Sequence, residues 1–266
     1  MLPAPRVGFL SLAKARDPKL HRAINEWHQL DHRPENLALE GVAHGERFVQ
    51  TPKLAATAHA RGGFEDFDYA TLYWLDAPEG RAIEVWSEFA EQSFREGRRP
   101  DVDLVDRPYM DFFRVAGYLP APGSRLNTRA LHFLPGTGVV IIARALPADA
   151  GRSALGRHHA WELDTVLPAL ANVPGYAAGW VLQNDSTLAP TEWSMREAAA
   201  VHDPAAEIIR LTWIITEVDQ PGTVLERILE TLGQVPESDA MLGETVFLGA
   251  AETITPWNWS WFDDEC

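Results

Sequence analysis

A weak internal repeat constrains the fold of this chain more than any other feature of its sequence. Four residues recur at a constant offset of 134 positions, because 161 − 27, 168 − 34, 175 − 41 and 179 − 45 all equal 134. The matched pairs are Trp27 and Trp161, Pro34 and Pro168, Gly41 and Gly175, and Gly45 and Gly179. A duplicated unit must give both halves the same fold.

Hydrophobic patterning predicts the same order of elements in each half. In the first half we expect strands at 7–15, 42–50, 67–75 and 108–119. Helices are expected from Asp17 to about residue 33 and around residues 82–90, with Pro34 beginning a new turn. Residues 51–66 are interpreted as an irregular insertion. In the second half the expected strands are 139–146, 176–183, 208–218 and 244–254, and the helices are 152–171 and one that starts at Pro221.

This order is β-α-β-β-α-β twice, the split βαβ arrangement. We therefore predict an α+β fold in which two ferredoxin-like repeats place their antiparallel sheets together as an α/β barrel. The predicted units are residues 1–119, a connector at 120–137 and a second repeat at 138–256. A Trp-rich acidic tail, residues 257–266, is expected to be a packing strap or a cover for a barrel mouth.

Charge and cysteine content narrow the range of partners. The 266 residues carry a formal net charge of −15, which disfavours binding to nucleic acid or to an anionic membrane. Cys266 is the one cysteine, so no intramolecular disulfide is expected, which fits a reducing cytoplasm. No run of about 18 apolar residues is present. Arg95, Arg98 and Arg99 are interpreted as part of a solvated loop. We expect a small-molecule substrate and a monomeric pseudo-dimer or a homodimer.

The stretch from Trp27 to Phe48 resembles the dimeric α/β-barrel superfamily, in particular its EthD-like members. The residues that carry the resemblance are Trp27, His28, His32, Pro34, Glu35, Gly41, Val42, Arg47 and Phe48. Glu40 departs from the pattern, because many relatives have proline before the glycine. The resemblance implies a barrel that hosts many chemistries. Relatives include cofactor-free monooxygenases, polyketide cyclases, lactone isomerases, decarboxylating enzymes and heme-dependent enzymes.

His28 and His32 are the candidate general acid or base. They are four residues apart and share a helix face, with Asp31 and Glu35 beside them to orient an imidazole. By spacing alone an exposed polar helix end explains them as well, and the resemblance favours catalysis. Arg47 would hold an anionic or enolate oxygen if it points into the barrel. A salt bridge with Glu35 or Asp31 is an equal alternative.

The second half does not keep these groups. The positions of His28, Asp31, His32, Glu35 and Arg47 are occupied there by Glu162, Thr165, Val166, Ala169 and Val181. One active site per chain is therefore expected. His158 and Glu162, four residues apart, are interpreted as a surface contact.

Aromatic and polar residues elsewhere are candidates for substrate binding: His44, Tyr69, Tyr73, Tyr109 and Trp213. His28 and His32 could also chelate a metal ion with Glu35 or His44 as a third ligand. The pair lacks the glutamate of the metallopeptidase pattern, so a general base is favoured and no metal site is predicted. Nucleotide-binding and serine-hydrolase motifs are also missing from the sequence.

The leading hypothesis is a cofactor-independent enzyme that acts on a small aromatic, polyketide-like or lactone substrate. It would begin with proton abstraction next to a carbonyl and end as an isomerase, cyclase, lyase or monooxygenase. A heme enzyme of the same barrel class, with a histidine as axial ligand, is the first alternative. A non-catalytic ligand-binding or assembly module is the second.

Overall fold

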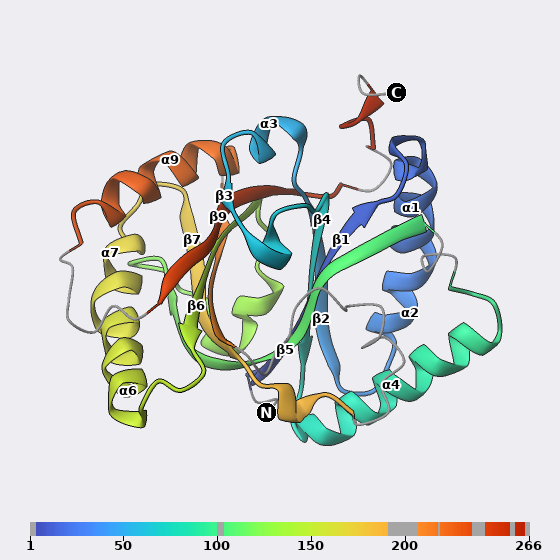
Figure 1. Cartoon of the computed structure of the whole chain (residues 1–266), viewed down its shortest axis with the longest axis horizontal. Helices are drawn as coiled ribbons and strands as arrows, with labels where there is room; N and C mark the ends of the chain where they lie inside the picture. Colours follow the sequence, from blue (N-terminus) through green and yellow to red (C-terminus); the bar gives the residue numbers. More distant parts are fainter. Residues whose placement is uncertain are drawn as a thin grey trace.

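The computed structural model describes residues 4–99, 104–190, 207–217, 219–235, 243–255 and 259–263. Figure 1 shows a ring of strands with helices on its outer side; apart from one short helix at the top, those of the first half lie on one flank and those of the second half on the other. Within these described ranges, no helix is long and apolar enough to cross a membrane.

The first repeat has the predicted order of elements, and most of the predicted bounds hold to within a few residues. Its strands are β1 (Val7–Ala15), β2 (Val42–Val49), β4 (Tyr69–Leu75) and β5 (Val105–Pro120). Its helices are α1 (His21–Trp27), a π-helical turn (His28–His32), α2 (Arg33–Leu37) and α4 (Glu79–Arg95).

The second repeat follows the same order after the connector, which contains a 3₁₀ helix at Thr128–Phe133. Its strands are β6 (Gly138–Pro147), β7 (Tyr176–Asn184), β8 (Glu207–Thr216) and β9 (Glu244–Thr253). Its helices are α6 (Arg152–Trp161), a π-helical turn (Glu162–Val166), α7 (Leu167–Leu170) and α9 (Pro221–Leu232).

The strands form one antiparallel sheet that closes on itself. The order among the described residues is β2-β4-β1-β5-β7-β8-β6-β9-β3, and β2 also pairs with β9. Each repeat contributes its strands in the order second, third, first, fourth, so the two repeats join at β5–β7 and at β9–β2 (Figure 1). The predicted fold class is confirmed: two ferredoxin-like repeats close into an α/β barrel within one chain.

The two junctions between the repeats differ. Strands β5 and β7 pair from Phe113 opposite Asn184 to Pro120 opposite Ala178. Strands β2 and β9 pair only at Phe48 with Thr253 and at Val49 with Glu252. The insertion at 51–66 lies at this shorter junction. It was predicted to be irregular, but it contains α3 (Pro52–Ala55) and the short strand β3 (His59–Ala60), which pairs with β9.

Local irregularities repeat at the same offset of 134 positions. The π-helical turns begin at His28 and Glu162 (162 − 28 = 134). Gly41 and Gly175 both have positive φ, at 88° and 92°. The register of β2 against β4 shifts between Val42 and His44, and that of β7 against β8 shifts between Tyr176 and Ala178. A bulge and a π-turn are conformations a chain adopts rarely, so their recurrence supports duplication independently of side-chain identity.

Pro34 lies inside a continuous helical run, which corrects the prediction of a new turn. The π-helical turn ends at His32 and α2 begins at Arg33, so helix continues through the proline. Proline lacks the N–H that an α-helix uses at this position. The π-helical turn just before Pro34 changes the hydrogen-bonding register, so the helix can continue through a residue that has no N–H to donate. Pro168 follows the second π-helical turn in the same way.

Apolar side chains fill both faces of the closed sheet. The barrel interior holds a core that includes Leu72, Trp74, Trp180 and Trp213. Outside, one cluster lies under α4, a second under α7 and α9, and a third beside α1. In the third cluster Phe262 of the tail stacks on the His21 ring, with centroids 3.6 Å apart. Residues 257, 258 and 264–266 of the tail lie outside the described part of the chain.

Candidate active site

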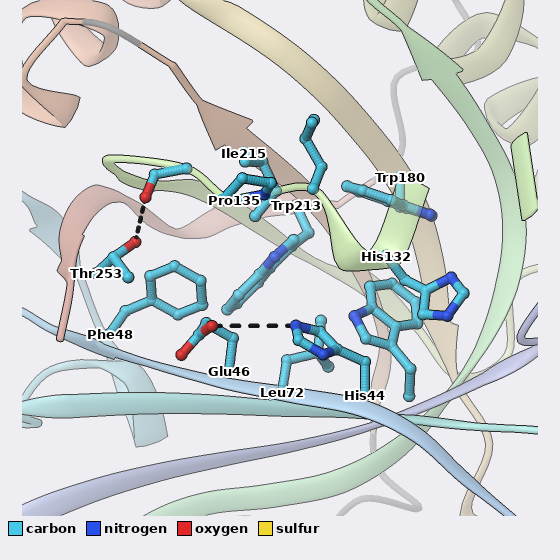
Figure 2. A pocket seen from close by; sticks show the side chains of 13 residues that line it. His44, Glu46, Phe48, Leu72, His132, Pro135, Trp180, Trp213, Ile215 and Thr253 are labelled. Atoms are coloured by element: carbon cyan, nitrogen blue, oxygen red, sulfur yellow. Dashed lines mark hydrogen bonds and ion pairs between the residues drawn. The ribbon is translucent and has the colours of Figure 1, made fainter. Parts of the chain in front are cut away.

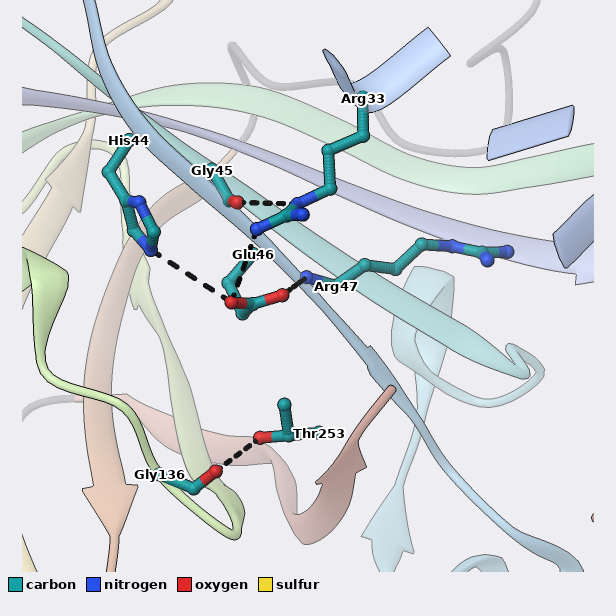
Figure 3. Close-up of polar contacts among 7 residues, drawn as sticks. All are labelled: Arg33, His44, Gly45, Glu46, Arg47, Gly136 and Thr253. Carbon is teal, nitrogen blue, oxygen red and sulfur yellow. Dashed lines mark hydrogen bonds and ion pairs between the residues drawn. The ribbon is translucent and has the colours of Figure 1, made fainter. Parts of the chain in front are cut away.

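Strand β2 separates the predicted site residues into two cavities. Side chains alternate across a strand, so His44, Glu46 and Phe48 face the barrel interior, whereas Arg47 faces the helices. Figure 3 shows the Arg47 side chain leaving β2 on the side opposite to Glu46. Arg47 therefore does not point into the barrel, which was the condition for holding a substrate oxygen there, and the strand period is the sequence signal that would have shown this.

The first cavity, here named the helix–sheet cavity, has a volume of about 50 Å³ between the first helical layer and the sheet. His28 and His32 enter it from the π-helical turn, and their ring centroids are 5.3 Å apart. Trp27, Arg47, Tyr73, Trp86 and Arg107 also line it. Single π-turns within helices are frequent at functional sites. Here the wide turn begins at one histidine and ends at the other.

Arg47 is a buried cation whose partners carry no formal charge. Its exposed fraction is 2%. Nη1 donates to Asn25 Oδ1 at 2.5 Å, and the guanidinium lies 3.8 Å from the Tyr69 ring centroid. Within the described residues Arg47 makes no ion pair. Burial lowers the pKa of Arg47 to about 10, and it remains protonated at neutral pH.

Two neutral side chains hold Arg47 in place. Asn25 donates from Nδ2 to the His21 carbonyl and to the Tyr69 hydroxyl, both at 2.8 Å, which leaves Oδ1 to accept from Arg47. The Tyr69 hydroxyl also lies 2.7 Å from His21 Nδ1. Burial raises the pKa of Tyr69 to about 12, so it is a neutral partner. Tyr69, predicted to bind substrate, instead supports Arg47.

Further arginines make the cavity electropositive. Burial, together with the charges of Arg99, Arg16 and Arg47, lowers the pKa of Arg107 to about 9. Arg99 is also buried, and burial lowers its pKa. The interpretation of Arg99 as part of a solvated loop is therefore wrong. Neither Arg107 nor Asn25 was singled out from the sequence, because both act through residues distant along the chain.

The protonation state of His32 follows from its neighbours. Trp86 Nε1, which can only donate, lies 3.2 Å from Asn36 Oδ1. This fixes the Asn36 amide, whose Nδ2 then donates to His32 Nε2 at 3.1 Å and to the Tyr73 hydroxyl at 3.1 Å. His32 Nε2 therefore carries no proton, and it already accepts a hydrogen bond from Asn36. Burial and the nearby arginines, Arg99 first, lower the pKa of His32 well below its usual value.

His28 is the imidazole that retains an available nitrogen. Its Nδ1 is buried and has no hydrogen-bond partner among the described residues. Burial, followed by the charges of Arg47 and His32, lowers the pKa of His28 well below its usual value, although the nearby Gln29 side chain favours the protonated ring. The ring is therefore neutral at pH 7 and able to accept a proton. The structure separates two histidines that the sequence treated alike.

The two predicted carboxylates do not orient either histidine. Asp31 is exposed on the outer side of the helical layer. Glu35 pairs with Arg98, which also pairs with Glu96. Asn36 takes the place expected for a carboxylate beside His32. The alternative of a salt bridge between Arg47 and Glu35 or Asp31 is also not what the structure contains.

The second cavity, here named the barrel cavity, has a volume of about 80 Å³ inside the barrel. Figure 2 shows Trp213 in the middle of its lining, with Phe48 on one side and Trp180 and His132 on the other. His44 and Glu46 also face it. Thus His44 and Trp213, both predicted to bind substrate, lie apart from His28. Tyr109 packs in the barrel core against Phe64, with ring centroids 4.6 Å apart.

The second repeat also contains a buried polar cluster, which corrects two predictions. His158 and Glu162 are not a surface contact, since their exposed fractions are 1% and 3%. Arg210, equally buried, donates from Nε to Glu162 Oε2 at 2.7 Å and from Nη1 to Gln183 at 3.0 Å. Burial opposes ionisation of Glu162, but His158 and Arg210 lower its pKa overall. Polar groups therefore persist in this half, where they neutralise one another.

No group of three or more histidine, cysteine, aspartate or glutamate side chains converges to hold a metal ion in the described ranges. No protein-family model matches the sequence, and no curated protein matches it.

Solved structures match the fold over nearly the whole chain. The encapsulated DyP-type peroxidase from Mycobacterium smegmatis is 10% identical, with 98% of this chain and 96% of that chain covered and a TM-score of 0.51. A protein from Fusobacterium nucleatum proposed to be a monooxygenase is 7% identical, with coverages of 96% and 94% and a TM-score of 0.51. A protein proposed to be a chlorite dismutase is 11% identical, with coverages of 99% and 100% and a TM-score of 0.50. These likenesses show the fold alone.

Proposed function

We propose that the chain is a cofactor-independent, EthD-like acid–base enzyme whose substrate is a small aromatic, polyketide-like or lactone compound. One observation carries this proposal. Arg47, a buried cation without a carboxylate partner, lines the same cavity as His28, whose Nδ1 has no hydrogen-bond partner among the described residues. A base and a preorganised positive charge are the two groups that enolate formation requires.

His28 acts as the general base in this mechanism. Its neutral imidazole takes a proton from the carbon next to the substrate carbonyl, and the electron pair of that C–H bond forms the enolate. The negative charge develops on the carbonyl oxygen, where Arg47 and Arg107 stabilise it. Return of the proton from His28 to a different carbon completes an isomerisation. The same enolate is the first intermediate of cyclisation or elimination, and of oxygen insertion when dioxygen is the co-reactant.

His32 has a positioning role. Its Nε2 is held by Asn36, and its ring stacks on Trp27 with centroids 4.6 Å apart and planes 13° apart. Trp27 precedes His28 in the chain, so this stack fixes the start of the π-helical turn from which His28 projects. His32 therefore orients His28 without exchanging a proton with the substrate.

Heme is the alternative cofactor, and the cavity is a poor fit for it. Pockets for drug-sized ligands and cofactors usually measure about 300–1,000 Å³, whereas the helix–sheet cavity measures about 50 Å³ and so admits only the carbonyl end of a small substrate. No step is assigned to heme. Titration of the protein with heme is expected to give no Soret band above that of free heme.

A non-catalytic binding module is less well supported, because ionisable groups face both cavities.

Deuterium exchange tests the proton-abstraction step without knowledge of the final product. Incubation with 2-tetralone and with an unsaturated γ-lactone in D₂O is expected to label the carbon next to the carbonyl, as followed by NMR. His28→Ala should slow this exchange by about 10²–10⁴-fold, the usual contribution of a general base. His158→Ala, in the neutralised cluster, is the matched control. An unchanged rate in a folded His28→Ala protein would contradict the mechanism.

A further inference from the structure

The barrel cavity contains a polar group that the proposed reaction does not use. His132 belongs to the connector and has an exposed fraction of 7%. The residue lines the cavity, and its Nε2 is buried without a hydrogen-bond partner among the described residues. Buried polar atoms in folded proteins nearly always have a partner. An imidazole nitrogen left unpaired beside a cavity therefore indicates a ligand that supplies one.

Aromatic rings form the rest of the wall. Phe48 and Trp213 meet edge to face with centroids 5.4 Å apart, and Trp74 and Trp180 lie 5.3 Å apart. The volume of about 80 Å³ is roughly half of the ~150 Å³ that encloses benzene. The Glu46 and His44 side chains are 29% and 21% exposed, so the polar end reaches solvent. A ligand with a flat apolar end and a polar end fits this shape, with its ring partly enclosed.

The charges of the lining favour an uncharged ligand. Burial lowers the pKa of His132 to about 4, and burial aided by the Arg33 charge lowers the pKa of His44 to about 4, so both rings are neutral at pH 7. Glu46 already accepts from Arg33 Nη2 at 3.4 Å and from the Arg47 backbone N–H at 3.2 Å (Figure 3). An anion would be repelled by Glu46, and a cation would compete with Arg33 for it. A hydroxyl both donates and accepts, so it pairs with His132 Nε2 in either tautomer.

We infer that the barrel cavity is a second binding site, separate from the helix–sheet cavity, for a small uncharged aromatic alcohol of the phenol class whose hydroxyl bonds to His132. The two sites use opposite faces of β2 and share no side chain. Ligand binding in the barrel cavity can therefore be tested independently of catalysis at His28.

NMR of the tryptophan indole N–H groups tests this site on the full chain. Addition of phenol is expected to shift the resonances of Trp74, Trp180 and Trp213 in a saturable way, while those of Trp27 and Trp86 in the helix–sheet cavity stay in place. His132→Leu should weaken phenol binding about tenfold, the effect of one hydrogen bond. Toluene, which has no hydroxyl, should bind the wild-type chain and this variant equally. His59→Leu, at an exposed histidine on β3, is the matched control.

A second measurement needs no variant. Phenol, but not toluene, should shift the ¹⁵N resonance of His132 Nε2 in the wild-type chain. The inference is overturned if phenol produces no saturable shift, or if it shifts only Trp27 and Trp86. It is also overturned if His132 Nε2 does not respond to bound phenol, or if benzoate or benzylammonium binds the barrel cavity more tightly than phenol.

Discussion

Both repeats bury an arginine between their helices and the sheet, and they treat its charge differently. In the second repeat, Arg210 has the carboxylate of Glu162 at 2.5 Å. In the first repeat, Arg47 has the neutral oxygen of Asn25 and the face of Tyr69. His28 occupies the position that corresponds to Glu162 (162 − 28 = 134). The same place in a duplicated helix therefore holds a counterion in one copy and a neutral imidazole in the other.

The difference shows how a duplicated fold can divide its tasks. A buried ion pair is costly to break, because removing one partner leaves the other charge uncompensated. The Arg210 cluster therefore has a structural role in the second repeat. Arg47 has a charge that no carboxylate of the described chain neutralises, so a substrate anion can use it. The first repeat therefore lacks the electrostatic stabilisation that Glu162 gives the second.

Loss of the counterion in the second repeat should have the largest effect on stability. Glu162→Gln leaves Arg210 buried without a carboxylate, and we expect the free energy of unfolding to fall by about 3–5 kcal/mol. Urea unfolding followed by circular dichroism measures this. Glu35→Gln, which removes the partly exposed partner of Arg98, is the control and should cost less than about 1 kcal/mol. Equal losses in the two variants would remove the contrast between the repeats.

Giving the first repeat a counterion should weaken its affinity for anions. His28→Glu places a carboxylate where the second repeat has Glu162, and it should pair with Arg47. Benzoate binding, measured by calorimetry, should weaken about 10–100-fold, since a hydrogen bond to a charged group contributes about 1.5–3 kcal/mol. His28→Gln has nearly the same shape without the charge and should lose less. Equal losses would show that the imidazole, and not the lack of a carboxylate beside Arg47, determines binding.

Removal of the uncompensated arginine should change stability little. Arg47→Met eliminates a desolvated charge but leaves Asn25 Oδ1 without its donor, and these effects oppose each other. The free energy of unfolding should stay within about 1 kcal/mol of wild type, while deuterium exchange and benzoate binding are lost. A destabilisation as large as that of Glu162→Gln would mean that Arg47 is structural, like Arg210.

Acid should weaken the fold through its neutral histidines. His44 and His132 have pKa values of about 4 in the folded chain, below the ~6.5 of an unfolded histidine. The unfolded state then binds more protons as the pH falls from 6.5 to 4, so stability present above pH 6.5 is progressively lost in that range. Urea unfolding at pH 7.5, 5.5 and 4.5 measures the slope. His132→Leu should flatten it, whereas His59→Leu should leave it unchanged.

The sequence predicted the elements of the fold well, because hydrophobic period and turn residues act locally. Its errors at the site arose from contacts between distant strands. At the offset of 134, Trp180 corresponds to Glu46. The residues that pair with them on the neighbouring strands, Trp213 and Leu72, are 141 positions apart (213 − 72 = 141), so the offset between the repeats is larger in that part of the chain. A comparison at 134 therefore could not align Arg210 with Tyr69, which are also 141 apart. The pairing of Arg210 with Glu162 remained hidden, and that half seemed to have lost its polar groups.

The roles of individual side chains depended on features without a clear sequence pattern. The tautomer of His32 is fixed by Trp86, which lies 50 residues beyond Asn36. The exposed position of Asp31 follows from the π-helical turn, which rotates this stretch relative to an ordinary α-helix. The partition of His44 and Arg47 into separate cavities was available from the two-residue period of a strand, once β2 was predicted.

The bulge between Val42 and His44 has a consequence for how the two cavities can change over time. It fixes the register of β2, and a one-residue slip would send every later side chain of that strand to the other face. Substitutions at even-numbered positions after the bulge alter only the chamber within the barrel, and those at odd-numbered positions alter only the one beneath the helices. Deletion of a single residue at the bulge would move the β2 side chains of each chamber into the other. Point mutations can therefore change one chamber at a time, while small deletions change both.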